Sequence, residues 1–89
     1  MPRLVGPSKY TPLTDYLRAQ PVDEVRLTLA EIEQILGVPL PAWARRPAFW
    51  ANSPRSVFRP QPWVRAGWWV VRTDLYARPP AVTFARAPR

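Results

Sequence analysis

The sequence predicts one small domain of the α/β type, in its α+β form, with short helices and a two- to three-stranded antiparallel sheet. The first indication is Thr28-x-x-Glu31, a capping box that marks a helix start. The second is a pair of β-rich runs, residues 68–75 and 81–86, close enough to form a hairpin. The third is the 47% of hydrophobic residues in a chain of 89, which is enough for one core.

The first expected element is a short helix over residues 12–20, with Thr11 as its N-cap. Thr11-Pro12 is typical of a helix start, because proline is tolerated in the first turn. The apolar residues that follow have the i, i+3, i+4 spacing of one helix face, and they are Leu13, Tyr16 and Leu17. Pro21 is expected to end this helix.

A short strand at residues 25–27 should lead into a second helix at residues 28–36. Thr28 and Glu31 form the capping box, and Gly37 is the expected helix end because glycine tolerates the left-handed conformation. The buried face of this helix would consist of Leu29, Ile32, Ile35 and Leu36.

A third helix is expected to open at Pro41, to run through Trp43, Arg45 and Arg46, and to be limited by Pro47. A turn through Phe49 and Trp50 should follow. Residues 54–62 are rich in arginine and proline and receive no element. One helical turn is expected at residues 63–66, ended by Gly67.

The strand at residues 68–75 alternates in polarity. This alternation predicts Trp69, Val71 and Leu75 on one face, and on the other Trp68, Val70, Arg72 and Asp74. The order of helix, strand, two helices, insert and β-hairpin is that of a winged helix-turn-helix. We divide the chain into a basic leader (1–9), the winged-helix-like domain (10–86) and a tail (87–89).

The charge of the chain is strongly segregated. Residues 1–44 hold four basic and five acidic side chains, whereas residues 45–89 hold nine arginines against Asp74 alone. Solubility requires net charge but not segregated charge, so a polyanionic partner explains the pattern better. We therefore expect a non-enzymatic nucleic-acid-binding protein, with double-stranded DNA as the favoured ligand.

Nine residues are the candidate nucleic-acid contacts: Arg45, Arg46, Asn52, Arg55, Arg59, Arg65, Trp68, Arg72 and Arg78. Arg45 and Arg46 would lie on the recognition helix, where a guanidinium can bond guanine or phosphate. They could instead form a solvated helix face, or pair with Glu31 or Glu33. Asn52 could read adenine, although it is more readily explained as the cap of the turn at Ser53-Pro54.

The remaining arginines of the second half, including Arg86, are predicted to contact phosphates rather than bases. Neutralising four to six phosphates predicts a log–log salt slope of about −4 to −5. The alternative is that these side chains only keep the surface soluble. The tryptophans could stack on bases, but core packing explains most of them. Trp50, Trp63 and Trp69 fit buried positions, while Trp68 and Trp43 are the better surface candidates.

Several classes of chemistry are excluded or disfavoured. The chain has no cysteine and no histidine, so disulfides, Cys/His zinc sites, thiol nucleophiles and imidazole acid–base catalysis are ruled out. Glu31 and Glu33 are two residues apart on a helix and point in different directions. We expect no catalytic residues, no metal and no cofactor. No signal peptide or membrane span is recognisable, so the expected location is cytoplasmic.

The chain also resembles a family of small bacterial domains of unknown function. The residues that carry the resemblance are Lys9-Tyr10-x-Pro12-Leu13-x-x-Tyr16-Leu17, Leu27-Thr28-x-x-Glu31-Ile32-Glu33-x-Ile35-Leu36-Gly37-x-Pro39-Leu40-Pro41, Ala44-Arg45-Arg46, Trp50-Ala51-Asn52, Trp63-x-x-Ala66-Gly67-Trp68 and Val82-Thr83-Phe84. The resemblance covers nearly the whole chain, and it implies neither catalytic residues nor an activity.

Two other kinds of partner remain open. A basic, tryptophan-rich surface also suits an acidic protein, as in an adaptor or an inhibitor of phage or plasmid type. RNA or the ribosome would use the same arginines. The chain is expected to be a monomer or a homodimer, and a two-fold dimer would favour a palindromic DNA site.

Overall fold

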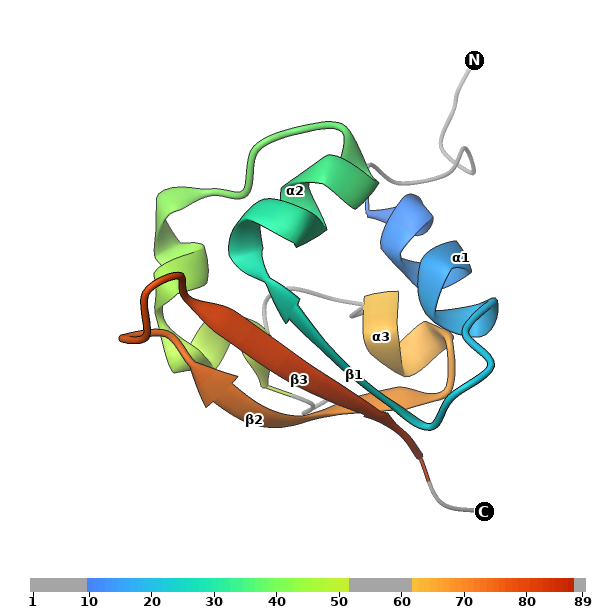
Figure 1. Ribbon diagram of the computed structural model, residues 1–89. Helices are drawn as coiled ribbons and strands as arrows, with labels where there is room; N and C mark the ends of the chain where they lie inside the picture. The colour runs from blue at the N-terminus through green and yellow to red at the C-terminus, as the bar shows by residue number, and fades with distance from the viewer. Residues whose placement is uncertain (1–9, 52–61, 88–89) are drawn as a thin grey trace.

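A three-stranded antiparallel sheet carries the helices on one of its faces (Figure 1). The computed structural model describes residues 10–51 and 62–87. In chain order the elements are α1 (Thr11–Arg18), β1 (Glu24–Thr28), α2 (Leu29–Leu36), the 3₁₀ turns η2 (Ala42–Arg45) and η3 (Pro47–Trp50), α3 (Pro62–Arg65), β2 (Trp68–Asp74) and β3 (Ala81–Arg86). The strand order is β1-β3-β2. The predicted α+β class is therefore confirmed.

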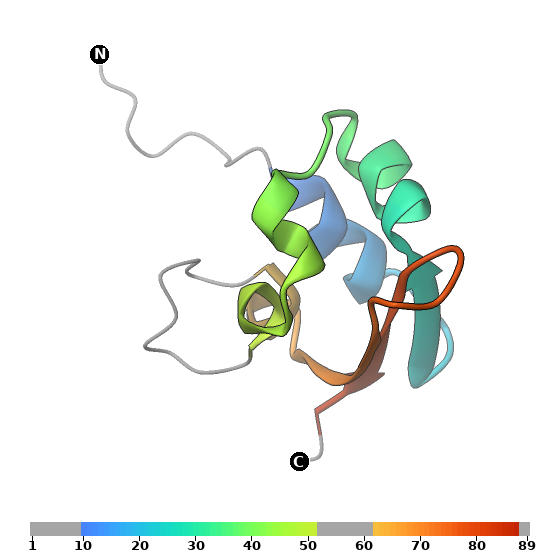
Figure 2. The same ribbon diagram turned by 90° about the vertical axis from the view of Figure 1, so that its left-hand side faces the viewer.

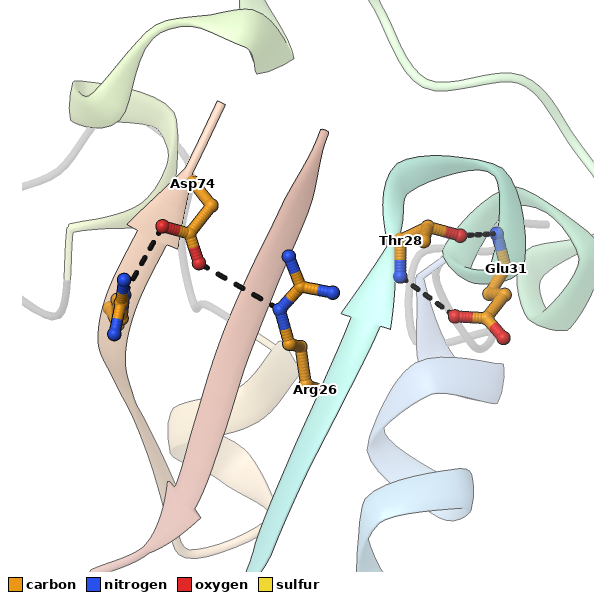
Figure 3. Close-up of polar contacts among 5 residues, drawn as sticks. Arg26, Thr28, Glu31 and Asp74 are labelled. Carbon is orange, nitrogen blue, oxygen red and sulfur yellow. Dashed lines mark hydrogen bonds and ion pairs between the residues drawn. The ribbon is translucent and has the colours of Figure 1, made fainter. Parts of the chain in front are cut away.

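The second helix has the caps that its sequence predicts. The Thr28 hydroxyl accepts a hydrogen bond from the Glu31 amide at 3.0 Å, and the Glu31 carboxylate accepts one from the Thr28 amide at 2.8 Å (Figure 3). Gly37 follows the helix with a φ of 76°, in the left-handed region that favours glycine. These local bonds satisfy backbone groups at both ends of α2, and they need no distant residue.

The predicted third helix is not formed. Residues 42–50 make two consecutive 3₁₀ turns instead, separated by Arg46 in an extended conformation with φ −102° and ψ 137°. Pro47 explains the break, because it lacks an amide hydrogen and forces the preceding residue out of the helical region. The Trp50 indole donates a hydrogen bond of 2.7 Å to the Ala44 carbonyl and so ties the second turn to the first. A continuous recognition helix is therefore absent from this segment.

A β-bulge in β2 changes which alternate residues face the core, so the predicted faces hold for Arg72, Asp74 and Leu75 after the bulge and fail for Trp68 and Trp69 before it. Val70 pairs with Phe84 and Arg72 pairs with Thr83, so Val71 is an extra residue without a partner in the register. On the N-terminal side of the bulge the core-facing residue is Trp68, whereas on the C-terminal side it is Leu75. Strict alternation predicted a single parity along the whole strand, and this prediction is wrong.

The tryptophans of β2 differ from the prediction, whereas those of the aromatic core agree with it. Trp50, Trp63 and Phe84 pack together, with ring centroids 5.3 to 6.3 Å apart. Trp68 is completely buried, whereas Trp69 is 42% exposed. The prediction that Trp68 lies at the surface and Trp69 in the core is therefore wrong, because it rested on uninterrupted alternation. Burial of Trp50 and Trp63 and exposure of Trp43 follow the prediction.

Candidate nucleic-acid interface

Three of the candidate arginines belong to segments that lie at the same end of the molecule. The turns η2 and η3 (light green) and the β2–β3 loop (orange to red) both lie on the left in Figure 1, the side that faces the viewer in Figure 2. Arg45 closes η2, Arg46 follows it, and Arg78 lies in the β2–β3 loop. We call Arg45, Arg46 and Arg78 the arginine end.

Hydrogen bonds hold the two segments of the arginine end on α2. The Leu29 amide donates to the Pro80 carbonyl at 2.9 Å, which fixes the β2–β3 loop against the start of α2. The Leu40 amide donates to a Glu33 carboxylate oxygen at 2.7 Å, which fixes the chain just before η2. Arg45, Pro79 and Pro80 line a common hollow. Arg45 and the loop that carries Arg78 are therefore neighbours on a common support.

The charges of the arginine end are not neutralised within the described part of the chain. All three side chains are exposed, and none of them has an ion pair or a side-chain hydrogen bond to a described residue. The alternative pairing with Glu31 or Glu33 is not formed. Glu31 accepts from the Thr28 amide and Glu33 from the Leu40 amide. Three guanidinium groups are thus available to an external anion.

The structure places other candidates elsewhere. Arg65 ends α3 near the opposite end of the sheet, where its carbonyl accepts a hydrogen bond from Arg18 at 3.1 Å. Arg72 lies on the helix-free face of the sheet and pairs with Asp74 at 3.1 Å. Trp68 is in the core and cannot stack on a base. The candidates Asn52, Arg55 and Arg59 lie outside the described residues.

One arginine that sequence reasoning grouped with the phosphate contacts stabilises the fold instead. The Arg86 side chain pairs with Asp23 at 2.9 Å and donates to the carbonyls of Gln20 and Val22 at 2.9 and 3.0 Å. Its guanidinium also lies 4.8 Å from the centre of the Trp68 ring. Its partners are more than sixty residues away in the sequence, so no local pattern could reveal this role.

The described residues contain no candidate metal cluster and no candidate membrane span. Among residues 10–51 and 62–87, no group of three or more acidic side chains is placed to hold a metal ion. In the same residues, no helix is long and apolar enough to cross a membrane. Exposed guanidinium groups bind phosphate or carboxylate oxygens through charge-assisted hydrogen bonds.

The chain belongs to a protein family described as Domain of unknown function (DUF7662), whose family model matches residues 10–88. This membership agrees with the predicted resemblance to a small domain of unknown function. No curated protein and no solved structure matches the chain.

Proposed function

We propose that this protein is a non-enzymatic nucleic-acid-binding protein that contacts double-stranded DNA through the arginine end. The observation that carries the proposal is that two segments about thirty residues apart in the sequence place three exposed, unpaired arginines at one end of the molecule. Arginines that only served solubility would not need to converge. A rigid support for cations also lowers the entropic cost of binding a polyanion.

Phosphate contacts are the main expected interaction. Arg78 lies on the loop of the β2–β3 hairpin, as the wing of a winged helix would, and Arg45 and Arg46 approach the ligand from η2. Tyr76 is 94% exposed in the same loop, and its hydroxyl can donate to a phosphate oxygen. Because η2 and η3 form no long helix that could enter the major groove, we expect weak sequence preference. Base contacts by Arg45 and Arg46 are secondary in this proposal.

The test is fluorescence anisotropy with labelled duplex DNA, single-stranded DNA and RNA of equal length. Each ligand is titrated at several salt concentrations from roughly 50 to 200 mM. The test variant is Arg45→Ala/Arg46→Ala/Arg78→Ala, which removes the arginine end. We expect duplex affinity to fall at least about tenfold and the log–log salt slope to decrease by about 3, at about 0.9 per phosphate.

The control is Arg18→Ala/Arg65→Ala/Arg72→Ala, which removes the same number of charges outside the arginine end. We expect this variant to lose only a few-fold in affinity, because it weakens only the long-range attraction. Equal losses in both triple variants would contradict the proposed site. Absence of binding to all three ligands at low salt would contradict nucleic-acid binding altogether and favour an acidic protein partner. A clear preference for RNA would favour the RNA alternative.

A further inference from the structure

The face of the sheet that points away from the helices is bordered by charged and aromatic side chains. The strand register places three cross-strand rows on this outer face, which are Glu24–Ala85–Trp69, Arg26–Thr83–Arg72 and Thr28–Ala81–Asp74. The residues between them face the core, among them Leu27, Val82 and Phe84. The central column is small, so the two edge columns form the walls of a shallow trough.

The bulge at Val71 determines which side chains of β2 lie on the outer face. It places both Trp69 and Arg72 outward, although three positions separate them in the sequence. Trp69 and Val71 are 42% and 56% exposed, and Val71 and Arg72 line the hollow whose wall on the other side includes Arg26. Large exposed apolar groups beside arginine are typical of protein interfaces.

The charges of the outer face balance, unlike those of the chain as a whole. Asp74 lies 3.1 Å from the Arg72 guanidinium and 3.8 Å from that of Arg26 (Figure 3). Glu24 is exposed and has no ion pair with a described residue. Two acidic and two basic groups therefore share one face of a chain with net charge +7. A polyanion gains little from a neutral surface, whereas a second copy can approach it without like-charge repulsion.

We propose that a second copy of this chain docks on the outer sheet face and forms a two-fold symmetric dimer. Glu24 on β1 and Trp69 on β2 lie in the same cross-strand row. Arg26 on β1 and Arg72 on β2 lie together in the next row. One row corresponds to about 7 Å along the strands. We therefore place the two-fold axis in the interface, perpendicular to the strands and midway between these two rows. Rotation about this axis brings each row of one copy over the other row of the second copy.

This axis makes the face complementary to itself. It places Glu24 over Arg26 of the second copy, and Trp69 over Arg72 of the second copy, and symmetry repeats each contact. The result is two ion pairs and two cation–π contacts between sheets packed roughly 10 Å apart. Ala81 and Thr83 of β3 are buried beneath the edge side chains, so the two edge columns make the contacts between the copies. The proposal is independent of nucleic-acid binding, because the arginine end lies outside the interface.

The test is sedimentation equilibrium of the 89-residue chain from about 10 µM to 1 mM at roughly 150 mM salt. We expect a reversible rise in mass from 10.3 kDa toward twice that value. Glu24→Arg and Arg26→Glu should each weaken dimerisation at least about tenfold, since symmetry places like charges together twice. The double variant Glu24→Arg/Arg26→Glu should recover most of the lost affinity, because it restores opposite charges at the same positions.

A matched pair of aromatic variants tests the other contact. Trp69→Ala should weaken the dimer at least about tenfold, whereas Trp43→Ala, which removes a similarly exposed tryptophan from η2, should not. Circular dichroism establishes that each variant is folded; if Arg26→Glu fails to fold, the tryptophan pair decides. A constant mass of one chain up to the highest concentration would overturn the proposal. So would equal effects of the two tryptophan variants, or no recovery in a folded charge-swapped double variant.

Discussion

The two ends of the sheet use arginine in opposite ways. At the end where β2 begins and β3 finishes, Arg86 pairs with Asp23, bonds two carbonyls and lies over the Trp68 ring. At the end formed by η2, η3 and the β2–β3 loop, Arg45 and Arg78 have no ion pair with any residue that the structure describes. The first end uses its positive charge inside the fold, and the second leaves its positive charge exposed and unpaired.

This difference shows that a count of arginines in the sequence overestimates how many of them are available to bind a partner. All of the basic side chains in the second half of the chain contribute equally to net charge, but an arginine already held by a carboxylate and two carbonyls has few donors left for a phosphate. Its release would also cost stability. The candidates for binding are therefore the arginines that the fold leaves unpaired.

The largest expected effect is on stability. Arg86→Ala removes one ion pair, two charge-assisted hydrogen bonds and the stacking on Trp68, so we expect a loss of about 2 kcal/mol in the free energy of unfolding. Urea denaturation followed by circular dichroism measures this value. The control Arg78→Ala should change it by less than about 0.5 kcal/mol. A similar loss of stability in both variants would contradict the conclusion that Arg86 stabilises the fold and Arg78 does not.

A smaller effect is expected on binding. Arg78→Ala should weaken duplex DNA binding by about five- to tenfold at low salt, because one phosphate contact is lost at the arginine end. Arg65→Ala removes an equal charge from an exposed side chain near the other end, and we expect less than about a twofold change. Anisotropy titrations of the two variants under identical conditions measure the difference. A larger loss of affinity in Arg65→Ala than in Arg78→Ala would indicate that DNA binds near Arg65 instead.

The smallest expected effect is the loss of stability on removing Asp23, which separates the ion pair of Arg86 from its other contacts. Asp23 is highly exposed, with 88% of its side chain accessible, so solvent screens its ion pair. Asp23→Ala should therefore reduce stability much less than Arg86→Ala, because the carbonyl bonds and the Trp68 stacking remain. Urea denaturation of both variants and of the double variant tests this order. A loss equal to that of Arg86→Ala would show that the carboxylate holds the whole contact together.

The elements with local signals could be predicted from the sequence. The capping box and Gly37 define α2 within ten consecutive residues, and the two β-rich runs define the hairpin of β2 and β3. Pro47 already limited the third helix, and the structure shows that it breaks the segment into two 3₁₀ turns. In each case the backbone bonds are made or prevented by neighbours in the chain, which a one-dimensional pattern contains.

Which side chains face outward, and which charges remain unpaired, depends on how distant segments pack together. The bulge at Val71 exists because β2 must pair with β3, and it exchanges the positions predicted for Trp68 and Trp69. The role of Arg86 depends on two carbonyls and a carboxylate that lie more than sixty positions away in the sequence. The arginine end depends on a loop held to α2 by a single backbone bond from Leu29 to Pro80. These are contacts between distant segments, so composition and periodicity contain no information about them.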